Sequence, residues 1–384
     1  METTFKQSRE DQARASSYLT LLGLLVLGSA CRDNDEERPP IVWTGEHVQV
    51  GTDLDLDAWC PGTLPRLDSY VGTLKTLFEV PDDHVVTYYL YPSPVTDYAC
   101  QGRYLACFTQ GAVFTSDLLD THELVHAVSA VYRAIPHFFE EGAASYWGHA
   151  FPADFRGLDI RDVLDEYWSS GLPNSGYALA GHFMSYLVHT YGMERYLALL
   201  RTSNRQQSRE DFEQAFEKTM GNTLDDAIDD YEAQWPYCDV TATARSLHDC
   251  EQPAIKLPPG EWMNFDLDIS CVDPEVVGPS TPGGSGDGPR IWRDLTVDVE
   301  TETQNIKFDI PELGEPNTVI MDIKRCDTRC GDVMLNRWRL TPNHVIGNPN
   351  EFLIKLKAGR YVVRVSRAVD DPGPVHFGWR PQAF

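Results

Sequence analysis

Residues 115–149 read TSDLLDTHELVHAVSAVYRAIPHFFEEGAASYWGH, and this stretch decides the fold around it. Its first half contains the pattern HExxH, formed by His122, Glu123 and His126. Positions four apart lie on one face of a helix, about one turn from each other, so both imidazoles can reach one metal ion. Glu123 then lies beside the open coordination position, where it can act as a general base. The pattern predicts a helix that carries two metal ligands and a base.

The residues around the motif indicate two successive helices. Leucines and valines on both sides of HELVH recur at helical spacing. Ser116 or Asp117 can cap the start of the first helix, and Pro136 marks its end. Pro136 can also open a second helix, which a short connection returns antiparallel to the first. Glu141 then lies about one and a half turns into the second helix, level with the two histidines.

A catalytic zinc ion usually has three protein ligands and one water, so a third ligand is needed. Glu140 and Glu141 compete for this role. They point about 100° apart on a helix, so only one of them can face the histidines. Gly142 and Ala143 would let the two helices approach closely around the metal.

HELVH followed by PHFFEEGAASY resembles the gluzincin metallopeptidases, the thermolysin-like and aminopeptidase-N-like group. That family carries a Glu-Gly-x-Ala pattern on a second helix, and its glutamate is the third zinc ligand. The resemblance implies one zinc ion per chain, held by His122, His126 and Glu141, with Glu123 as the general base for a zinc-bound water. The exopeptidase signature Gly-x-Met-Glu-Asn is not found upstream, so an endopeptidase is expected.

Two residues further along are candidates for a second donor to the developing oxyanion, which is commonly a Tyr or His in this family. The segment YALAGHFMSYL, residues 177–187, resembles the helix that follows the zinc helices in small bacterial peptidase-like domains of the group. It contains Tyr177 and His182, and the sequence leaves both open. Nothing past Cys238 takes part in the resemblance.

The N-terminus predicts export. After a basic start, the apolar run 18–30 is too short for a comfortable transmembrane helix and typical of a signal-peptide core. It ends in LGSAC, which resembles a bacterial lipoprotein signal, so residues 1–31 are expected to be a signal peptide ending at a lipidated Cys31. Residues 32–40 are charged and end in prolines, as suits a tether. The protein is then anchored in the cell envelope, at the outer membrane or cell surface. Ordinary cleavage after Ala30, which gives a secreted protein, is the alternative.

Charge excludes one class of partner. The chain has 384 residues, 42% of them hydrophobic, which is enough for two domains with substantial cores. Its formal net charge is -26. Binding to nucleic-acid phosphate needs patches of Lys and Arg, so no nucleic-acid partner is expected. The expected partners are a peptide or protein substrate and, through the lipid, a membrane.

Nine cysteines become an even set once Cys31 is set aside for lipid. Eight cysteines in an exported protein predict four disulfides. Four of them precede residue 240 and four follow it, so two bridges in each half are expected, with a domain boundary near 240. A metal site at Cys326 and Cys330 is the alternative for that pair.

The predicted fold class is α+β, because a small sheet is followed by helices and then by alternating short strands. A thermolysin-like zinc peptidase domain is expected at 41–240, and a β-sandwich, jelly-roll-like domain at 241–384 with a flexible loop at 278–290. Ala112–Thr115 resembles the edge strand with which substrate backbone pairs in thermolysin-like domains, and plain scaffold is the alternative for so short a strand. The predicted strands are 41–52, 84–91, 104–109, 112–115, 292–299, 306–310, 318–325, 352–357 and 361–367, and the other predicted helices are 64–78, 177–202, 209–220 and 224–235.

Two functions of different class follow. The first is an exported, membrane-anchored zinc metallopeptidase that hydrolyses peptide bonds. The second is a catalytically inactive surface binding or maturation protein that retains the zinc site for stability. The presence of both histidines, the base Glu123 and the third ligand Glu141 favours the enzyme.

Overall fold

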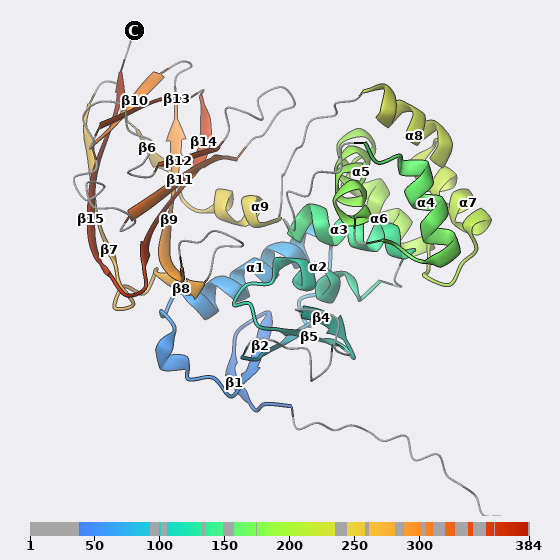
Figure 1. Ribbon diagram of the computed structural model, residues 1–384, viewed down its shortest axis with the longest axis horizontal. Coiled ribbons are helices and arrows are strands. Elements are labelled where there is room, and N and C mark those ends of the chain that lie inside the picture. The colour runs from blue at the N-terminus through green and yellow to red at the C-terminus, as the bar shows by residue number, and fades with distance from the viewer. Residues whose placement is uncertain are drawn as a thin grey trace, which may run out of the picture. The chain divides into compact units, whose positions relative to one another are not determined.

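The computed structural model describes most of the chain from residue 38 onward (Figure 1). Residues Arg38–Phe384 form one compact unit, in which the largest sets of buried apolar side chains make two cores. The predicted signal peptide and most of the predicted tether lie outside the described residues. None of the described helices combines the length and apolar character that crossing a membrane requires. The described residues are 38–92, 100, 106–132, 135–148, 157–173, 175–234, 244–257, 261–280, 288–300, 304–309, 319–326, 337–340, 351–356 and 358–382.

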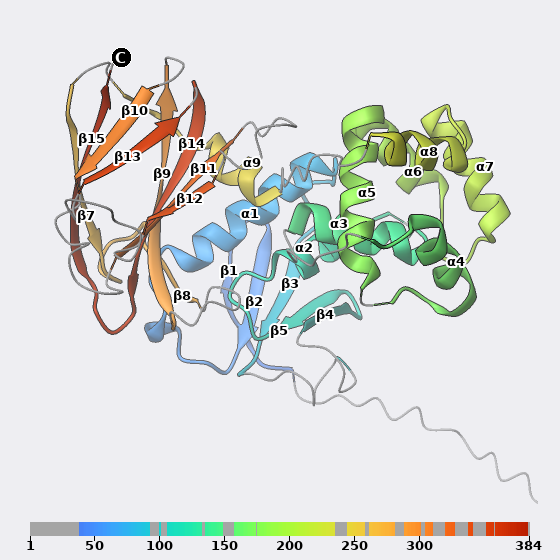
Figure 2. The same ribbon diagram turned by 45° about the horizontal axis from the view of Figure 1, so that its top comes forward.

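The first core contains one face of a five-stranded mixed sheet with the strand order β1-β2-β3-β5-β4 (Figure 2). Strands β2, β3 and β5 are parallel, and β1 and β4 run antiparallel to their neighbours. Helix α1 makes the crossover that parallel pairing of β2 with β3 requires. The elements are β1 Ile41–Thr44, β2 Val48–Thr52, the 3-10 turn Leu56–Ala58, α1 Thr63–Leu77, β3 Val86–Leu90, β4 Ala106–Thr109 and β5 Ala112–Thr115.

The predicted strand 41–52 is two strands joined by a turn. Gly45 N donates to Val48 O at 2.8 Å, which closes the turn. The Asp68 carboxylate of α1 accepts the backbone N–H groups of His47 at 2.7 Å and Val48 at 3.0 Å. The break therefore depends on a carboxylate about twenty residues away in the sequence, which local strand propensity does not reveal.

The predicted edge strand is wrong. Strand β5 lies between β3 and β4, so its backbone is paired on both sides. Strand β4 is the edge in the described part of this sheet. The prediction failed because the order of strands in a sheet depends on long-range pairing, which is absent from the sequence of any one strand.

Helices α2 to α8 follow the sheet and complete the first core. Gly192 has φ of 87° and divides the predicted helix 177–202 into α5 and α6, since that backbone conformation favours glycine. Helix α4 was not predicted, although Asp159 caps it by accepting from the backbone N–H groups of Arg161 and Asp162. Ser208 caps α7 and Thr223 caps α8, each by accepting a backbone N–H of the first turn. The helices are α2 Thr121–Ser129, α3 His137–Gly148, α4 Ile160–Ser170, α5 Gly176–Tyr191, α6 Met193–Thr202, α7 Arg209–Met220 and α8 Leu224–Ala233.

The second core lies between two largely antiparallel sheets, with orders β13-β10-β15-β7 and β12-β11-β14-β9-β6, and β8 pairs with β9. Strand β7 alternates exposed and buried positions, with Phe265, Leu267 and Ile269 inside. The five strands predicted after residue 250 correspond to β9, β10, β11, β13 and β14 within two residues at each end. The elements are α9 Ala244–Glu251, β6 Ile255–Lys256, β7 Met263–Ile269, β8 Val277–Ser280, β9 Arg290–Val299, β10 Gln304–Asp309, β11 Val319–Arg325, β12 Arg337–Leu340, β13 Glu351–Leu356, β14 Gly359–Ala368 and β15 Gly373–Gln382.

The disulfides correct the predicted pairing. Cys60 pairs with Cys271, 211 residues away, and so joins the N-terminal half to the β-rich half. Cys100–Cys107 and Cys250–Cys326 each lie within one half. Two bridges per half is therefore wrong, and the bridge to Cys250 excludes Cys326 from the alternative metal site. The predicted domain boundary near 240, Cys238 and Cys330 all lie outside the described residues.

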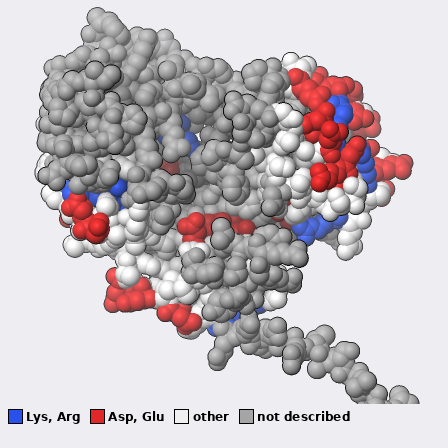
Figure 3. All heavy atoms as spheres, in the orientation of Figure 1, with Lys and Arg blue, Asp and Glu red and all other residues white. Residues whose placement is uncertain are grey.

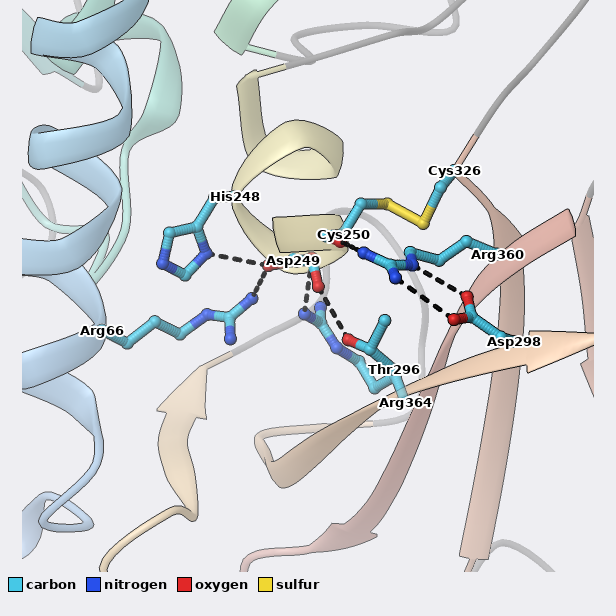
Figure 4. Close-up of a disulfide and its surroundings, with 9 residues drawn as sticks. All are labelled: Arg66, His248, Asp249, Cys250, Thr296, Asp298, Cys326, Arg360 and Arg364. Atoms are coloured by element: carbon cyan, nitrogen blue, oxygen red, sulfur yellow. Dashed lines mark hydrogen bonds and ion pairs between the residues drawn. A yellow bond between two sulfur atoms is a disulfide. The ribbon is translucent and has the colours of Figure 1, made fainter. Parts of the chain in front are cut away.

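A buried cluster of charges on α9, α1 and two strands also joins the halves (Figure 4). Asp249 of α9 pairs with Arg66 of α1 at 2.5 Å, and Arg66 also reaches Asp294 of β9 at 2.9 Å. Arg364 of β14 bonds Asp294 through two nitrogens, each at 2.7 Å. His248 bridges Asp249 at 3.1 Å and Ser69 of α1 at 2.8 Å. Burial alone would raise the pKa of Asp294, but Arg364 and Arg66 outweigh burial and lower it.

Replacing Asp294 by Asn is expected to lower the free energy of unfolding by about 3 kcal/mol, because two largely buried arginine side chains lose a charged partner. Ionised Asp294 stabilises the parent at pH values above the usual aspartate pKa, and this stabilisation is lost as the pH falls through the lowered pKa of the folded state. The difference in free energy of unfolding between the two proteins should therefore narrow below about pH 4. Denaturant unfolding of both proteins at pH 3 to 7 measures this. A difference in free energy of unfolding that does not depend on pH would contradict the ionic explanation.

Acidic side chains gather over α7 and α8, on the right of the space-filling view (Figure 3). These helices bury Phe212 and Phe216, and Ile228 and Tyr231, at helical spacing, and their opposite faces are exposed. The exposed acidic residues are Glu210, Asp211, Glu217, Asp225, Asp226, Asp229, Asp230 and Glu232. This surface agrees with an acidic, solvated exterior.

Candidate metal centre

Asp120 caps the N-terminus of α2, which differs from the two predicted caps. The Asp120 carboxylate accepts the backbone N–H of Glu123 at 3.2 Å, so Asp120 is the cap rather than Ser116 or Asp117. Thr115, the last residue of β5, donates its hydroxyl to the same carboxylate at 3.0 Å. The end of the central strand therefore fixes the start of the helix that carries HExxH.

Helix α3 begins directly after Pro136, as predicted, and Pro136 O accepts the backbone N–H of Phe139 at 2.9 Å. Three side-chain atoms from α2 and α3 converge. His122 Nε2 lies 3.1 Å from Glu141 Oε2, His126 Nε2 lies 3.4 Å from the same oxygen, and the two nitrogens are 3.3 Å apart. Among the described residues, His122, His126 and Glu141 are the group of such side chains that could hold a metal ion.

The size of this triangle fits a metal. Tetrahedral bonds of about 2.0–2.1 Å place ligand atoms about 3.3–3.4 Å apart, because the edge of a tetrahedron is about 1.6 times the bond length. The three observed separations, 3.1, 3.3 and 3.4 Å, lie close to that value. Two imidazoles and one carboxylate are also the donor set of many catalytic metal sites. The residues present therefore fit a divalent metal ion.

Without a metal, protons balance the charge of this cluster. Burial alone would raise the pKa of Glu141, but hydrogen bonds from His122, His126 and His137 outweigh burial and hold it far below its usual range. Burial alone would lower the pKa of His126, but the hydrogen bond to Glu141 and nearby carboxylates raise it to about 9. A metal ion would take over the role of these protons, since histidine ligands must be neutral.

Glu123 is on α2 beside the triad but is not one of its three members. Burial raises its pKa, while the two histidines act in the opposite direction. A partly desolvated carboxylate next to a metal site has the proton affinity that a general base needs. Glu123 is therefore a neighbour of the candidate ligands and not one of them.

The two candidate oxyanion donors lie in different surroundings. The Tyr177 ring stacks beside His122, with centroids 6.4 Å apart. His182 is buried and bonds Tyr231 Oη of α8 through Nδ1 at 2.7 Å. These contacts favour Tyr177 over His182 as a residue that can act at the triad.

Glu140 and Glu141 lie on opposite sides of the His126 ring, so the structure distinguishes their roles. Its Oε1 lies 3.7 Å from His126 Nδ1, on the far side of the imidazole from Glu141. Its Oε2 pairs with Arg205 at 3.0 Å. A carboxylate behind a ligand histidine orients the ring and increases its basicity. Glu140 therefore lies behind His126, beyond hydrogen-bond distance, instead of joining the triad.

His137 belongs to the site, although neither HExxH nor the Glu-Gly-x-Ala pattern includes it. Its Nε2 lies 2.8 Å from Glu141 Oε1. The signal available in the sequence was the i,i+4 spacing of the two residues on one helix. His149, which flanks the other end of this helix, lies outside the described residues.

Close helix packing holds the triad together, through different residues from those predicted. A Cβ added at Gly142 would lie 2.7 Å from Ala180 O, so this glycine admits α5 rather than α2. A Cβ added at Gly148 would lie 2.6 Å from His122 Cα and 2.9 Å from Thr121 O. Gly148 is therefore the residue that lets α3 touch the backbone of the first ligand.

Replacing Gly148 by Ala is expected to push α2 away from α3, lowering the free energy of unfolding by about 1–3 kcal/mol and weakening metal binding. Denaturant unfolding and a metal competition titration measure the two effects. Gly181→Ala is the matched control, because its Cβ would overlap Ser145 Cβ at 2.9 Å without touching α2. Equal loss of metal affinity in both variants would contradict a specific displacement of His122.

Comparison with known proteins gives similarity to solved structures only at a low level. No family model and no curated protein matches the sequence. Among solved structures, the pre-peptidase C-terminal domain of a collagenase from Bacillus anthracis is similar at 13% identity over 34% of this chain and 99% of that domain, with a TM-score of 0.20. A likeness at this level establishes neither fold nor function.

Proposed function

We propose that the protein is a zinc metallopeptidase of gluzincin type that hydrolyses internal peptide bonds. The observation that carries this proposal is the convergence of His122 Nε2, His126 Nε2 and Glu141 Oε2 with mutual distances of 3.1–3.4 Å. Two imidazoles and a carboxylate leave a tetrahedral ion one open position, which is the property of a catalytic rather than a structural zinc site.

In the proposed mechanism zinc, when bound, supplies Lewis acidity at the open position. Glu123 accepts a proton from the attacking water as oxygen adds to the peptide carbonyl carbon. The same carboxylate then gives that proton to the leaving nitrogen as the carbon–nitrogen bond breaks. A carboxylate suits both roles, because it can take up a proton and release it.

Tyr177 is the proposed donor to the developing oxyanion. Its ring lies beside His122, and a hydroxyl at the edge of a metal site can stabilise negative charge that appears during the reaction. His182 is a weaker candidate, since its Nδ1 already bonds Tyr231.

Strand β4 is the proposed docking edge for substrate. An extended peptide can add to an exposed sheet edge through main-chain hydrogen bonds. β4 forms that edge in the described part of the sheet, and its partner β5 leads directly through Thr115 to the cap of α2. This arrangement supports an endopeptidase of thermolysin-like architecture. The β-rich half is proposed to be a jelly-roll-like accessory domain.

Export and lipid anchoring at Cys31 are part of the proposal. The three disulfides of the described chain support an oxidising compartment. Mass spectrometry of the mature N-terminus tests the anchor. A lipid-modified Cys31 supports it, a start at an unmodified Cys31 supports the secreted form, and a retained residue 1 contradicts export.

The test of the function is cleavage of a diverse peptide mixture by the purified protein. Cleavage should stop on removal of metal by a chelator and return when zinc is restored. A protein that holds its metal and cleaves nothing would favour the alternative of an inactive binding or maturation protein.

A further inference from the structure

The two oxygens of the Glu141 carboxylate face different partners. Oε2 lies 3.1 Å from His122 Nε2 and 3.4 Å from His126 Nε2. Oε1 lies 2.8 Å from His137 Nε2, on the first residue of the same helix. Glu141 is only 7% exposed, so these neighbours, rather than solvent, determine how the carboxylate is oriented.

His137 is itself held in place. Its backbone N–H donates to Tyr167 Oη of α4 at 2.8 Å. The Tyr177 ring of α5 meets the imidazole edge to face, with centroids 6.4 Å apart and planes at 89°. Tyr167 therefore holds the backbone of His137 and Tyr177 contacts its ring. A histidine at helix position i reaches the carboxylate at i+4 without a change of backbone.

The contact has a defined direction. A carboxylate oxygen accepts hydrogen bonds, so His137 donates its Nε2–H to Glu141 Oε1. That donation occupies Oε1 and leaves Oε2 directed at the two candidate ligand nitrogens. A carboxylate that is free to turn can bind a metal through both oxygens, which uses up a coordination position.

We propose that His137 is a positioning residue that holds Glu141 to one-oxygen coordination and thereby keeps the remaining metal position open. The inference rests on the metal site of the proposed function but not on turnover. Partners that orient metal ligands typically change metal affinity by about 10–100-fold when they are removed.

The experiment compares the full mature protein with His137→Ala and His137→Gln. The alanine removes the donor, whereas the glutamine amide keeps an N–H near the position of Nε2. His189→Ala is the control, because His189 is an exposed histidine of α5 whose Nδ1 contact is with Ser185 O at 2.8 Å. Thermal unfolding of the metal-free proteins checks that all four fold.

Two readouts that are independent of activity decide the outcome. In a zinc competition titration with a coloured chelator, His137→Ala should bind about 10–100-fold more weakly, while His137→Gln and His189→Ala stay within a few fold of the parent. With cobalt(II) in place of zinc, His137→Ala should lose visible absorption intensity, because a carboxylate bound through both oxygens raises the coordination number and lowers the intensity. His137→Gln should restore it.

Three results would overturn the inference. The first is a His137→Ala protein with the affinity and cobalt spectrum of the parent. The second is complete loss of metal in that variant, which would make His137 a ligand. The third is a folded His137→Gln protein no better than His137→Ala. If the parent holds metal with the expected response of the variants but cleaves no peptide, the inference stands and the proposed peptidase function fails.

Discussion

Replacing Glu123 by Gln should reduce peptide cleavage by about 10²–10⁴-fold while leaving metal content unchanged, because general-base catalysis contributes a factor of this size. Gln keeps the size and shape of the side chain but cannot accept a proton. Glu123 is not one of the three convergent side chains, so the ion should remain bound. The loss should appear in kcat more than in KM, since proton transfer belongs to the transition state.

Glu166→Gln on the exposed face of α4 is the matched control for this change, and it should cleave like the parent. Metal content is measured by elemental analysis and cleavage with the same peptide mixture. A Glu123→Gln protein as active as the parent would show that the hydrolysis came from another site or a contaminant, and the mechanism proposed here would be wrong.

Replacing His126 by Ala should weaken zinc binding by about 10³-fold or more. Zinc sites with apparent binding free energies of about 10–16 kcal/mol distribute that energy over three or four ligands, or about 4 kcal/mol each. His126 is 8% exposed and lies between Glu141 and Glu140, so water cannot easily replace its nitrogen. The purified variant should contain no stoichiometric zinc.

The paired substitutions Glu141→Gln and Glu140→Gln separate the ligand from its neighbour. The first should lose zinc as His126→Ala does. The second should weaken binding by at most about 10–100-fold, because Glu140 faces His126 Nδ1 at 3.7 Å from outside the triad. Full zinc stoichiometry in His126→Ala, or equal effects of the two glutamine variants, would refute the ligand assignment.

The glycines beside the triad pack against helices that residue spacing alone did not predict. Gly142 follows the candidate ligand in the sequence, so it was expected to admit α2, yet its close contact is with Ala180 of α5. Gly148, one turn and a half further, touches His122 instead. Spacing along a helix indicates which residues share a face, but it does not say which neighbouring helix that face meets.

The side chains of the candidate metal site could be predicted from the local sequence. His122 and His126 could be named because helix geometry places residues four apart on one face, and Pro136 marked the break between the two helices. The choice of Glu141 over Glu140 came from the resemblance to gluzincins. The alternation of β-rich segments after residue 250 likewise predicted most of the later strands, since strand periodicity is local.

Tertiary structure decided everything that required distant segments to meet. The edge position of β4, the Cys60–Cys271 bridge, and the role of His137 toward Glu141 depend on which elements pack together. Asp120 rather than Asp117 caps α2 because Thr115 at the end of the central strand holds its carboxylate. Such pairings are selected by the free energy of the whole packed chain against loop-closure entropy, and no single stretch of sequence contains that balance.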